Sequence, residues 1–151
     1  MIITLPILRI KLEIDSVPTR VLVVDDDVEM TDLLKIVLEP NAFQVMAANS
    51  GREGVELARD TSPDVIVLDL LMPDMDGWQV CSEIRKFSQA PILILSAINK
   101  PGLAAQALDS GADDFLLKPM PSGVLIAHLK MLTRRSRAGQ IDKQTKLNYY
   151  L

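Results

Sequence analysis

The chain has a single cysteine, a single histidine and no excess of positive charge, and each scarcity excludes a class of function. Cys81 cannot form an internal disulfide, and a lone cysteine fits a reducing compartment, so we expect a cytoplasmic protein. With no second cysteine or nearby histidine to share a metal, an inert, partly buried thiol is favoured over a reactive one. The net charge of -4 and a pI of about 4.9 offer nothing to attract nucleic acid.

The apolar N-terminal segment, residues 1–12, is too short to span a bilayer. A proline interrupts it, its basic residues follow the apolar stretch, and no small-residue cleavage site comes after it. We therefore expect neither a targeting signal nor contact with a membrane. Residues 1–19 are assigned as an N-terminal extension, either ordered, for example as an added edge strand, or a surface arm.

Most of the chain follows a regular alternation of strand-like and helical patterns. Its 151 residues, 48% of them hydrophobic, suit one domain with an ordinary core. Strands are expected near 20–25, 43–48, 64–69, 91–96 and 114–117, and helices near 28–38, 51–60, 77–87, 101–110 and 122–136. This βαβ repeat predicts an α/β fold, a doubly wound five-stranded parallel sheet with helices on both faces.

Four of the expected strands end in polar residues. Each begins as an apolar run suited to a strand that is buried on both faces. In open α/β sheets, ligands bind in the crevice beyond the carboxyl ends of the strands. Three carboxylates, a hydroxyl and an ammonium should therefore meet in one pocket, supplied by Asp25, Asp26, Asp69, Ser96 and Lys118.

These groups suit a divalent cation beside a phosphoryl group. Asp25 and Asp26 are adjacent, and such close like charges are unfavourable unless they share a cation. Mg²⁺ prefers oxygen ligands and typically takes one or two carboxylates together with a phosphate. A carboxylate such as Asp69 can also be a nucleophile towards phosphorus, and Lys118 would neutralise charge on the transferred group. Asp27 is expected to be the N-cap of the first helix.

At these motifs the chain resembles the receiver domain of two-component response regulators, over about residues 20–136. The matching motifs are Val23-Val24-Asp25-Asp26-Asp27, Leu68-Asp69-Leu70-Leu71-Met72-Pro73-Asp74-Met75-Asp76-Gly77, Leu95-Ser96-Ala97 and Gly111-Ala112-Asp113-Asp114-Phe115-Leu116-Leu117-Lys118-Pro119. The resemblance implies a flavodoxin-like sheet with strand order 2-1-3-4-5 and a site at the switch point between strands 1 and 3. We assign 20–137 as the receiver domain.

The resemblance also implies a role for each site residue. Asp69 would accept a phosphoryl group from a sensor histidine kinase or a phosphotransfer protein. Asp26, Asp69 and the backbone carbonyl of Leu71 would ligate Mg²⁺ directly, and Asp25 would act through water. Such a phosphoacceptor has weak self-phosphorylation and self-dephosphorylation activity at most, so we do not expect an enzyme.

Three further residues would respond to phosphorylation. By the resemblance, Ser96 and Lys118 would hold the new phosphoryl oxygens. Phe115 would rotate inward behind Ser96, so that these two residues form the switch. The new charge must be met by nearby donors and the cation, and that demand would bias a two-state surface.

The fourth helix, fifth strand and fifth helix form the expected interaction surface. Winged-helix relatives generally dimerise there through surface ion pairs, and this chain keeps charged residues at some of the positions and apolar or uncharged residues at others. We expect a homodimer, or a partner contact, held mainly by hydrophobic packing. The residues assigned to it are Leu103, Ala104, Ala107, Asp113, Asp114, Val124, His128 and Arg134.

Two readings of the output remain. Arg134, Arg135 and Arg137 resemble the start of the linker in winged-helix regulators of the OmpR/PhoB type, although they also suit a solvated helix C-terminus. We favour the regulatory half of a DNA-binding transcriptional regulator. Residues 138–151 would then be a tail or the start of a linker, even the first strand of an effector domain. The alternative is a stand-alone receiver that acts by protein–protein binding. In neither case are these residues expected to contact DNA.

Two other α/β classes are excluded by the same motifs. A haloacid-dehalogenase-like phosphatase needs a second aspartate two residues after its nucleophile, and Asp69 is followed by Leu70-Leu71. A flavodoxin-like electron carrier needs a hydroxyl- and glycine-rich phosphate loop after the first strand. The acidic run from Asp25 to Asp27 would repel the flavin phosphate.

Overall fold

The computed structural model describes the backbone of residues 17–149 and the side chains of 17–139. The proposed edge strand in residues 1–16 lies outside this part. The elements are β1 (Thr19–Val24), α2 (Val28–Leu38), the 3-10 turn η1 (Glu39–Asn41), β2 (Phe43–Ala48), α3 (Gly51–Thr61), β3 (Val65–Leu68), α4 (Gly77–Arg85), β4 (Ile92–Ser96), α5 (Leu103–Asp109), β5 (Asp114–Leu117) and α6 (Ser122–Tyr149).

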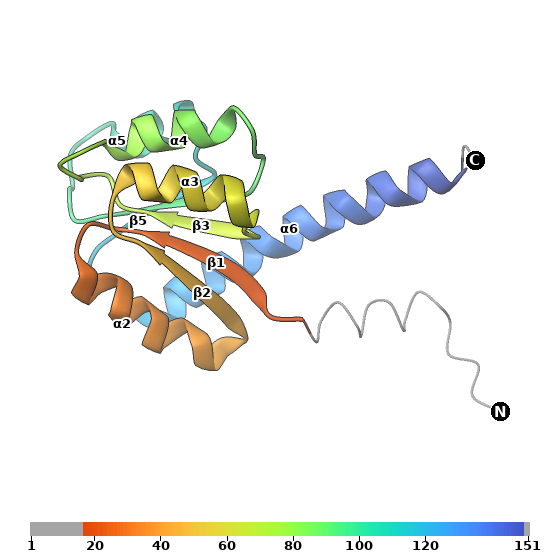
Figure 1. Ribbon diagram of the computed structural model, residues 1–151, viewed down its shortest axis with the longest axis horizontal. Coiled ribbons are helices and arrows are strands. Elements are labelled where there is room, and N and C mark those ends of the chain that lie inside the picture. The colour runs from red at the N-terminus through yellow and green to blue at the C-terminus, as the bar shows by residue number, and fades with distance from the viewer. Residues whose placement is uncertain (1–16, 150–151) are drawn as a thin grey trace.

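The five strands form one parallel sheet in the order β2-β1-β3-β4-β5 (Figure 1). The order, the parallel pairing and the helices on both faces confirm the predicted architecture. The strand order reverses between β1 and β3, so a crevice is expected where the loops after these two strands diverge. The fourth helix, fifth strand and fifth helix of the sequence pattern are α5, β5 and α6.

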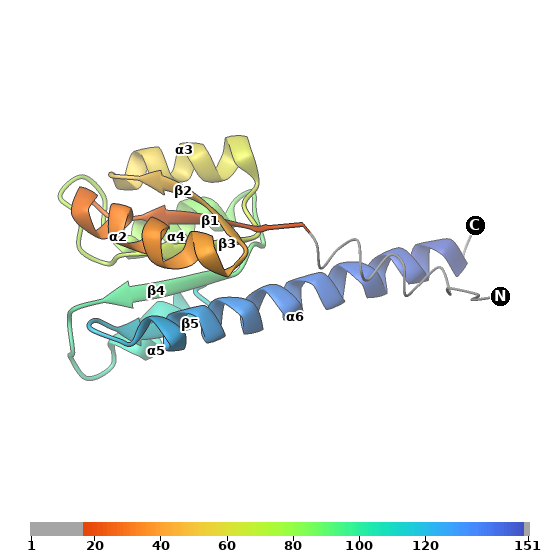
Figure 2. The same cartoon turned by 90° about the horizontal axis from the view of Figure 1, so that it is seen from below.

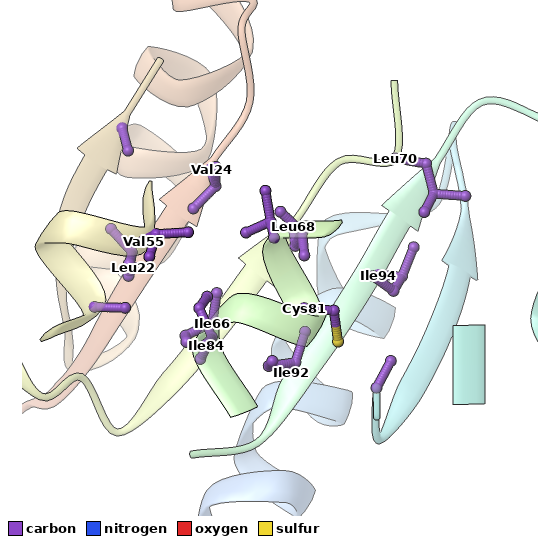
Figure 3. Close-up of a cluster of buried hydrophobic side chains, with 14 of the residues drawn as sticks. Leu22, Val24, Val55, Ile66, Leu68, Leu70, Cys81, Ile84, Ile92 and Ile94 are labelled. Carbon is purple, nitrogen blue, oxygen red and sulfur yellow. The ribbon is translucent and has the colours of Figure 1, made fainter. Parts of the chain in front are cut away.

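Two apolar layers cover the sheet, because successive side chains on a strand point to opposite faces. On β1, Leu22 and Val24 face the layer under α3, α4 and α5, whereas Val21 and Val23 face α2 and α6. Figure 3 shows the first layer, in which Cys81 of α4 packs among isoleucines and leucines. Cys81 is fully buried and its burial raises the thiol pKa, which agrees with the inert role expected for it.

The loops at the carboxyl end of the sheet begin helices with polar caps. The carboxylate of Asp27 accepts hydrogen bonds from two backbone N–H groups of α2, which confirms the predicted N-cap. Ser50 caps α3, and Asp76 forms a capping box with Gln79 at α4. Such caps satisfy the free N–H groups of a first helical turn. They therefore fix the loops that lie next to the expected site.

The last helix is longer than the sequence pattern predicts. We expected α6 to end near residue 136, but it continues to Tyr149 and projects beyond the sheet (Figure 2). The strand considered for the tail is thus wrong for residues 138–149. A single glycine, Gly139, costs a helix only about 1 kcal/mol, and no proline follows it. Within the described chain, neither α6 nor any other helix combines the length and apolar character needed to cross a membrane.

Candidate functional site

The three predicted carboxylates meet at the carboxyl ends of β1 and β3. Asp25, Asp26 and Asp69 place one carboxylate oxygen each within 4.8 Å of the others. Two backbone hydrogen bonds hold these strand ends in register, from Asp25 to the carbonyl of Ala48 (3.1 Å) and from Asp69 to the carbonyl of Val24 (2.9 Å). The sheet itself therefore brings together residues that are more than forty positions apart in the sequence.

Lys118 reaches this cluster from the end of β5. Its Nζ donates to Asp25 Oδ2 at 2.8 Å and lies 3.6 Å from Asp69 Oδ1. Its backbone N–H donates to the carbonyl of Ser96 at 2.7 Å, which ties the ends of β4 and β5 together. One lysine thus stands against three carboxylates in a partly buried site.

The electrostatic balance is clearest at Asp69. Burial raises its pKa to about 6, Lys118 opposes the rise, and the charge on Asp25 adds to it. The N–H of Leu70 also lowers this pKa and Asp26 also raises it, each less strongly. The single ammonium of Lys118 therefore does not balance the negative charge of the three carboxylates. A bound cation would balance it.

The oxygen donors fit Mg²⁺, which binds one or two carboxylates and keeps several waters. Both oxygens of Asp25 are already engaged, Oδ1 by the N–H of Asp27 (3.0 Å) and Oδ2 by Lys118. Asp25 is only 4% exposed. Asp26, by contrast, is exposed, and its carboxylate has no hydrogen bond or ion pair with any described residue. This difference favours Asp26 over Asp25 as a direct ligand.

A close backbone approach shapes the loop that follows Asp69. The N–H of Gly77 donates to the carbonyl of Leu70 at 2.8 Å, which folds the loop back on itself. A Cβ at Gly77 would lie 2.7 Å from the carbonyl oxygen of Asp69 and 2.9 Å from the Cα of Leu70. Only glycine fits there without moving the backbone that carries Asp69.

Among the described residues, neither of the two residues assigned to the switch, Ser96 and Phe115, forms a hydrogen bond with the site's carboxylates. Ser96 is 1% exposed, and its Oγ accepts a hydrogen bond from the N–H of Ile98 at 3.1 Å. Phe115 is half-buried against the core layer under α3, α4 and α5. The side chain of Leu71 is 61% exposed. The switch roles of Ser96 and Phe115, and the role of the Leu71 carbonyl as a Mg²⁺ ligand, stay predictions.

The predicted interaction surface needs one correction. Ala107 is fully buried in the core under α5, so its place on that surface is wrong. The helix turns it towards the sheet, whereas Ala104 on the same helix is exposed and Leu103 is half-buried. Leu108 (51% exposed) and Leu117 (38%) were missed and lie open on α5 and β5. Leu108 follows Ala104 by four residues, so helical spacing alone would have found it.

The charged and polar side chains predicted on this surface form hydrogen bonds or ion pairs with other residues of the same chain. Asp114 pairs with Nδ1 of His128, and Asp113 Oδ2 lies 2.8 Å from the guanidinium of Arg85. The Nε of Arg134 donates to the carbonyl of Lys130, one turn earlier in α6, at 3.3 Å. These intramolecular contacts leave fewer free charges to meet a partner.

Asn49 was also missed, although it directly follows β2. Its Nδ2 donates to the backbone carbonyl of Asp25 and to Thr31 Oγ1, at 3.0 Å in each case. The polar ends of the other four strands were identified from sequence, and the same rule applied to β2 points to this residue.

Comparison with known proteins decides the family. Residues 21–130 match the response regulator receiver domain. The chain belongs to this family. A receiver domain is a phosphoacceptor signalling module rather than an enzyme, and receiver domains work with histidine kinases as partners. The acidic cluster of this receiver domain is typical of the family's Mg²⁺ site.

Individual relatives agree with the assignment. The transcriptional regulatory protein SrrA of Staphylococcus aureus is 35% identical over 124 residues, which are 82% of this chain and 52% of SrrA. The chain thus spans about half the length of this curated relative. The Francisella response regulator 1452 receiver domain is 34% identical with a TM-score of 0.74, covering 78% of this chain and 98% of that one. The BeF3-activated receiver domain of Klebsiella pneumoniae RstA is 29% identical, again with a TM-score of 0.74, covering 77% and 99%.

Proposed function

We propose that Asp69 accepts a phosphoryl group from a sensor histidine kinase or a phosphotransfer protein. The supporting observation is the cluster of Asp25, Asp26 and Asp69 with Lys118 reaching into it. Mg²⁺ would be held by Asp26, Asp69 and the carbonyl of Leu71, with Asp25 acting through water. When bound, the cation would neutralise charge on the phosphoryl group.

The transfer is a displacement at phosphorus. A carboxylate oxygen of Asp69 forms a bond to the phosphorus as the bond between phosphorus and the donor's imidazole nitrogen breaks. The nitrogen keeps the electron pair and is protonated from solvent. Asp69 must be ionised to attack, and with a pKa of about 6 it is mainly ionised at neutral pH. Lys118 and Ser96 would then hold the phosphoryl oxygens.

The output that we propose is protein–protein binding by the face formed by α5, β5 and α6. Lys118 directly follows β5, and Ser96 ends β4, which pairs with β5. A phosphoryl group held by both residues would therefore act on the backbone of this face. We prefer this output to the winged-helix reading because α6 runs on as one helix to Tyr149, where that reading expects a linker. A place in transcription regulation rests on relatives such as SrrA alone.

The same face supports an apolar homodimer. Leu108, Leu117 and Val124 are 51%, 38% and 38% exposed on its three elements. The nearby carboxylate of Asp114 contacts Nδ1 of His128, so both side chains are already engaged within the chain. Exposed apolar side chains gathered on one face are typical of an interaction site, and their contacts would be only weakly sensitive to salt.

Phosphorylation is tested with acetyl phosphate and Mg²⁺, followed by intact-mass measurement. The wild type should gain the mass of one phosphoryl group and Asp69→Ala should gain none. Asp60→Ala, which removes an exposed carboxylate near the end of α3, is the matched control and should behave as the wild type. A wild type that gains no mass, or an equal gain in Asp69→Ala, would falsify the assignment.

The output is tested with the activated chain. With a phosphoryl mimic and Mg²⁺ bound, it should form a dimer or a protein complex, which sedimentation with and without the mimic would detect. An activated chain that stays monomeric and forms no complex would contradict an output through this face.

A further inference from the structure

We propose that Asn49 is a positioning residue for the metal site, acting through the peptide bond between Asp25 and Asp26. The proposal rests on the function proposed above and concerns how the chain aims Asp26 at the cation. The carbonyl of that peptide accepts a hydrogen bond from Asn49, which directly follows β2. No part of the phosphoryl chemistry itself is assigned to this residue.

The contact is directed at the backbone. Asn49 Nδ2 donates to the carbonyl oxygen of Asp25 at 3.0 Å, and this carbonyl shares one planar peptide group with the N–H of Asp26. The direction of the carbonyl therefore sets the direction in which the chain enters Asp26. Because Asp26 is exposed and its carboxylate has no hydrogen bond or ion pair with a described residue, little else restrains where it points.

Asn49 is itself held in place on two sides. Its second contact is with Thr31 Oγ1 at 3.0 Å, and that buried hydroxyl donates onward to the carbonyl of Val28 in the first turn of α2. The backbone N–H of Asn49 donates to Glu53 Oε2 at 2.9 Å, in the first turn of α3. The side chain of Asn49 is thus held by α2 and its backbone by α3, so the side-chain amide can hold the Asp25 carbonyl rigidly.

The other restraints on Asp25 come from different directions. Its N–H donates to Ala48, and its carboxylate meets Lys118 and the N–H of Asp27. None of these contacts reaches its carbonyl. Removing the Asn49 amide should therefore leave Asp25 in place and free the peptide that leads to Asp26. Outer-shell partners of metal ligands commonly change metal affinity by about 10- to 100-fold when removed.

The experiment is a Mg²⁺ titration by calorimetry of the wild type, Asn49→Ala and Asn41→Ala. Asn41 is the matched control, because its Nδ2 also donates to a backbone carbonyl at 3.0 Å, that of Val37 at the far end of α2. Asn49→Ala should bind Mg²⁺ at least about 10-fold more weakly, and Asn41→Ala should keep the wild-type affinity. Thermal unfolding in EDTA should show losses of similar size in the two variants, since each loses an amide–carbonyl hydrogen bond.

A second pair of variants covers the case in which Asn49→Ala does not fold. Thr31→Val removes the oxygen that holds Asn49 and should weaken Mg²⁺ binding in the same direction, whereas Thr31→Ser keeps the hydroxyl and should restore it. Wild-type Mg²⁺ affinity in Asn49→Ala, or an equal loss in Asn41→Ala, would overturn the proposal. A wild type that binds no Mg²⁺ would instead refute the proposed function.

Discussion

The charge on Asp69 should destabilise the metal-free protein, and Asp69→Asn should show by how much. Burial and the neighbouring carboxylates raise the pKa of Asp69 from 3.8 to about 6, despite Lys118. At 1.36 kcal/mol for each pKa unit, the ionised group costs the fold up to about 3 kcal/mol above pH 6. Asparagine has nearly the shape of the protonated acid. The substitution should therefore stabilise the protein at neutral pH.

The sign and the pH window follow from linkage. A raised pKa means that the native state binds the proton on Asp69 more tightly than the unfolded state does. The contribution of Asp69 to the free energy of unfolding is therefore fully present below the ordinary pKa of 3.8 and is lost as the pH rises through about 6. In EDTA at about pH 7.5, Asp69→Asn should unfold about 6–12 °C above the wild type, since about 1 kcal/mol moves the melting temperature of a chain of this size by about 2–4 °C. At about pH 4 the gap should be small.

Thermal unfolding across this pH range is the assay, and Asp74→Asn is its control. Asp74 lies in the same loop, but its pKa is lowered because its carboxylate accepts hydrogen bonds from the N–H groups of Gly51 and Arg52. Its contribution is present above the ordinary pKa and is lost as the pH falls, so Asp74→Asn should destabilise the protein at neutral pH. Added Mg²⁺ should narrow the gap between the wild type and Asp69→Asn. The reasoning would be refuted if Asp69→Asn were no more stable than the wild type at neutral pH. It would also be refuted if the variant were stabilised by the same amount in acid.

Two further predictions concern the phosphorylated state. Hydrolysis of the aspartyl phosphate needs water held in line with the phosphorus. By the family resemblance, the residues two beyond Asp69 and two beyond Ser96 overhang the approach of this water. Here they are Leu71 and Ile98, neither of which can orient water, so dephosphorylation should be slow. Leu71→Asn should shorten the phosphoryl lifetime measured by intact mass, and an unchanged or longer lifetime would contradict this. The dimer of the activated chain should persist from low to high salt in sedimentation and be lost in Val124→Glu. Dissociation by salt alone would mean that ion pairs hold the interface.

The pattern of apolar runs predicted the fold well because it reports burial directly. Strands covered on both faces must be apolar throughout, and helices covered on one face repeat their apolar residues every three or four positions. The five strands and the start of each helix were placed within two residues. The end of α6 was not, because the polar residues of a solvated helix differ little from those of a loop, so the pattern gives no clear end.

The candidate site, like the fold, was predicted in part from the sequence and decided in part by the tertiary structure. The amino-acid sequence by itself determined which groups stand at the strand ends, because parallel strands must deliver their last residues to one edge of the sheet. Only the tertiary structure decided what each group contacts: that Lys118 rests on Asp25, that Asn49 holds the Asp25 carbonyl, and that burial raises the pKa of Asp69. It also turned Ala107 into the core and left Leu108 in solvent. Direction, burial and distance depend on how separate elements pack together, and residue types in one dimension do not contain that information.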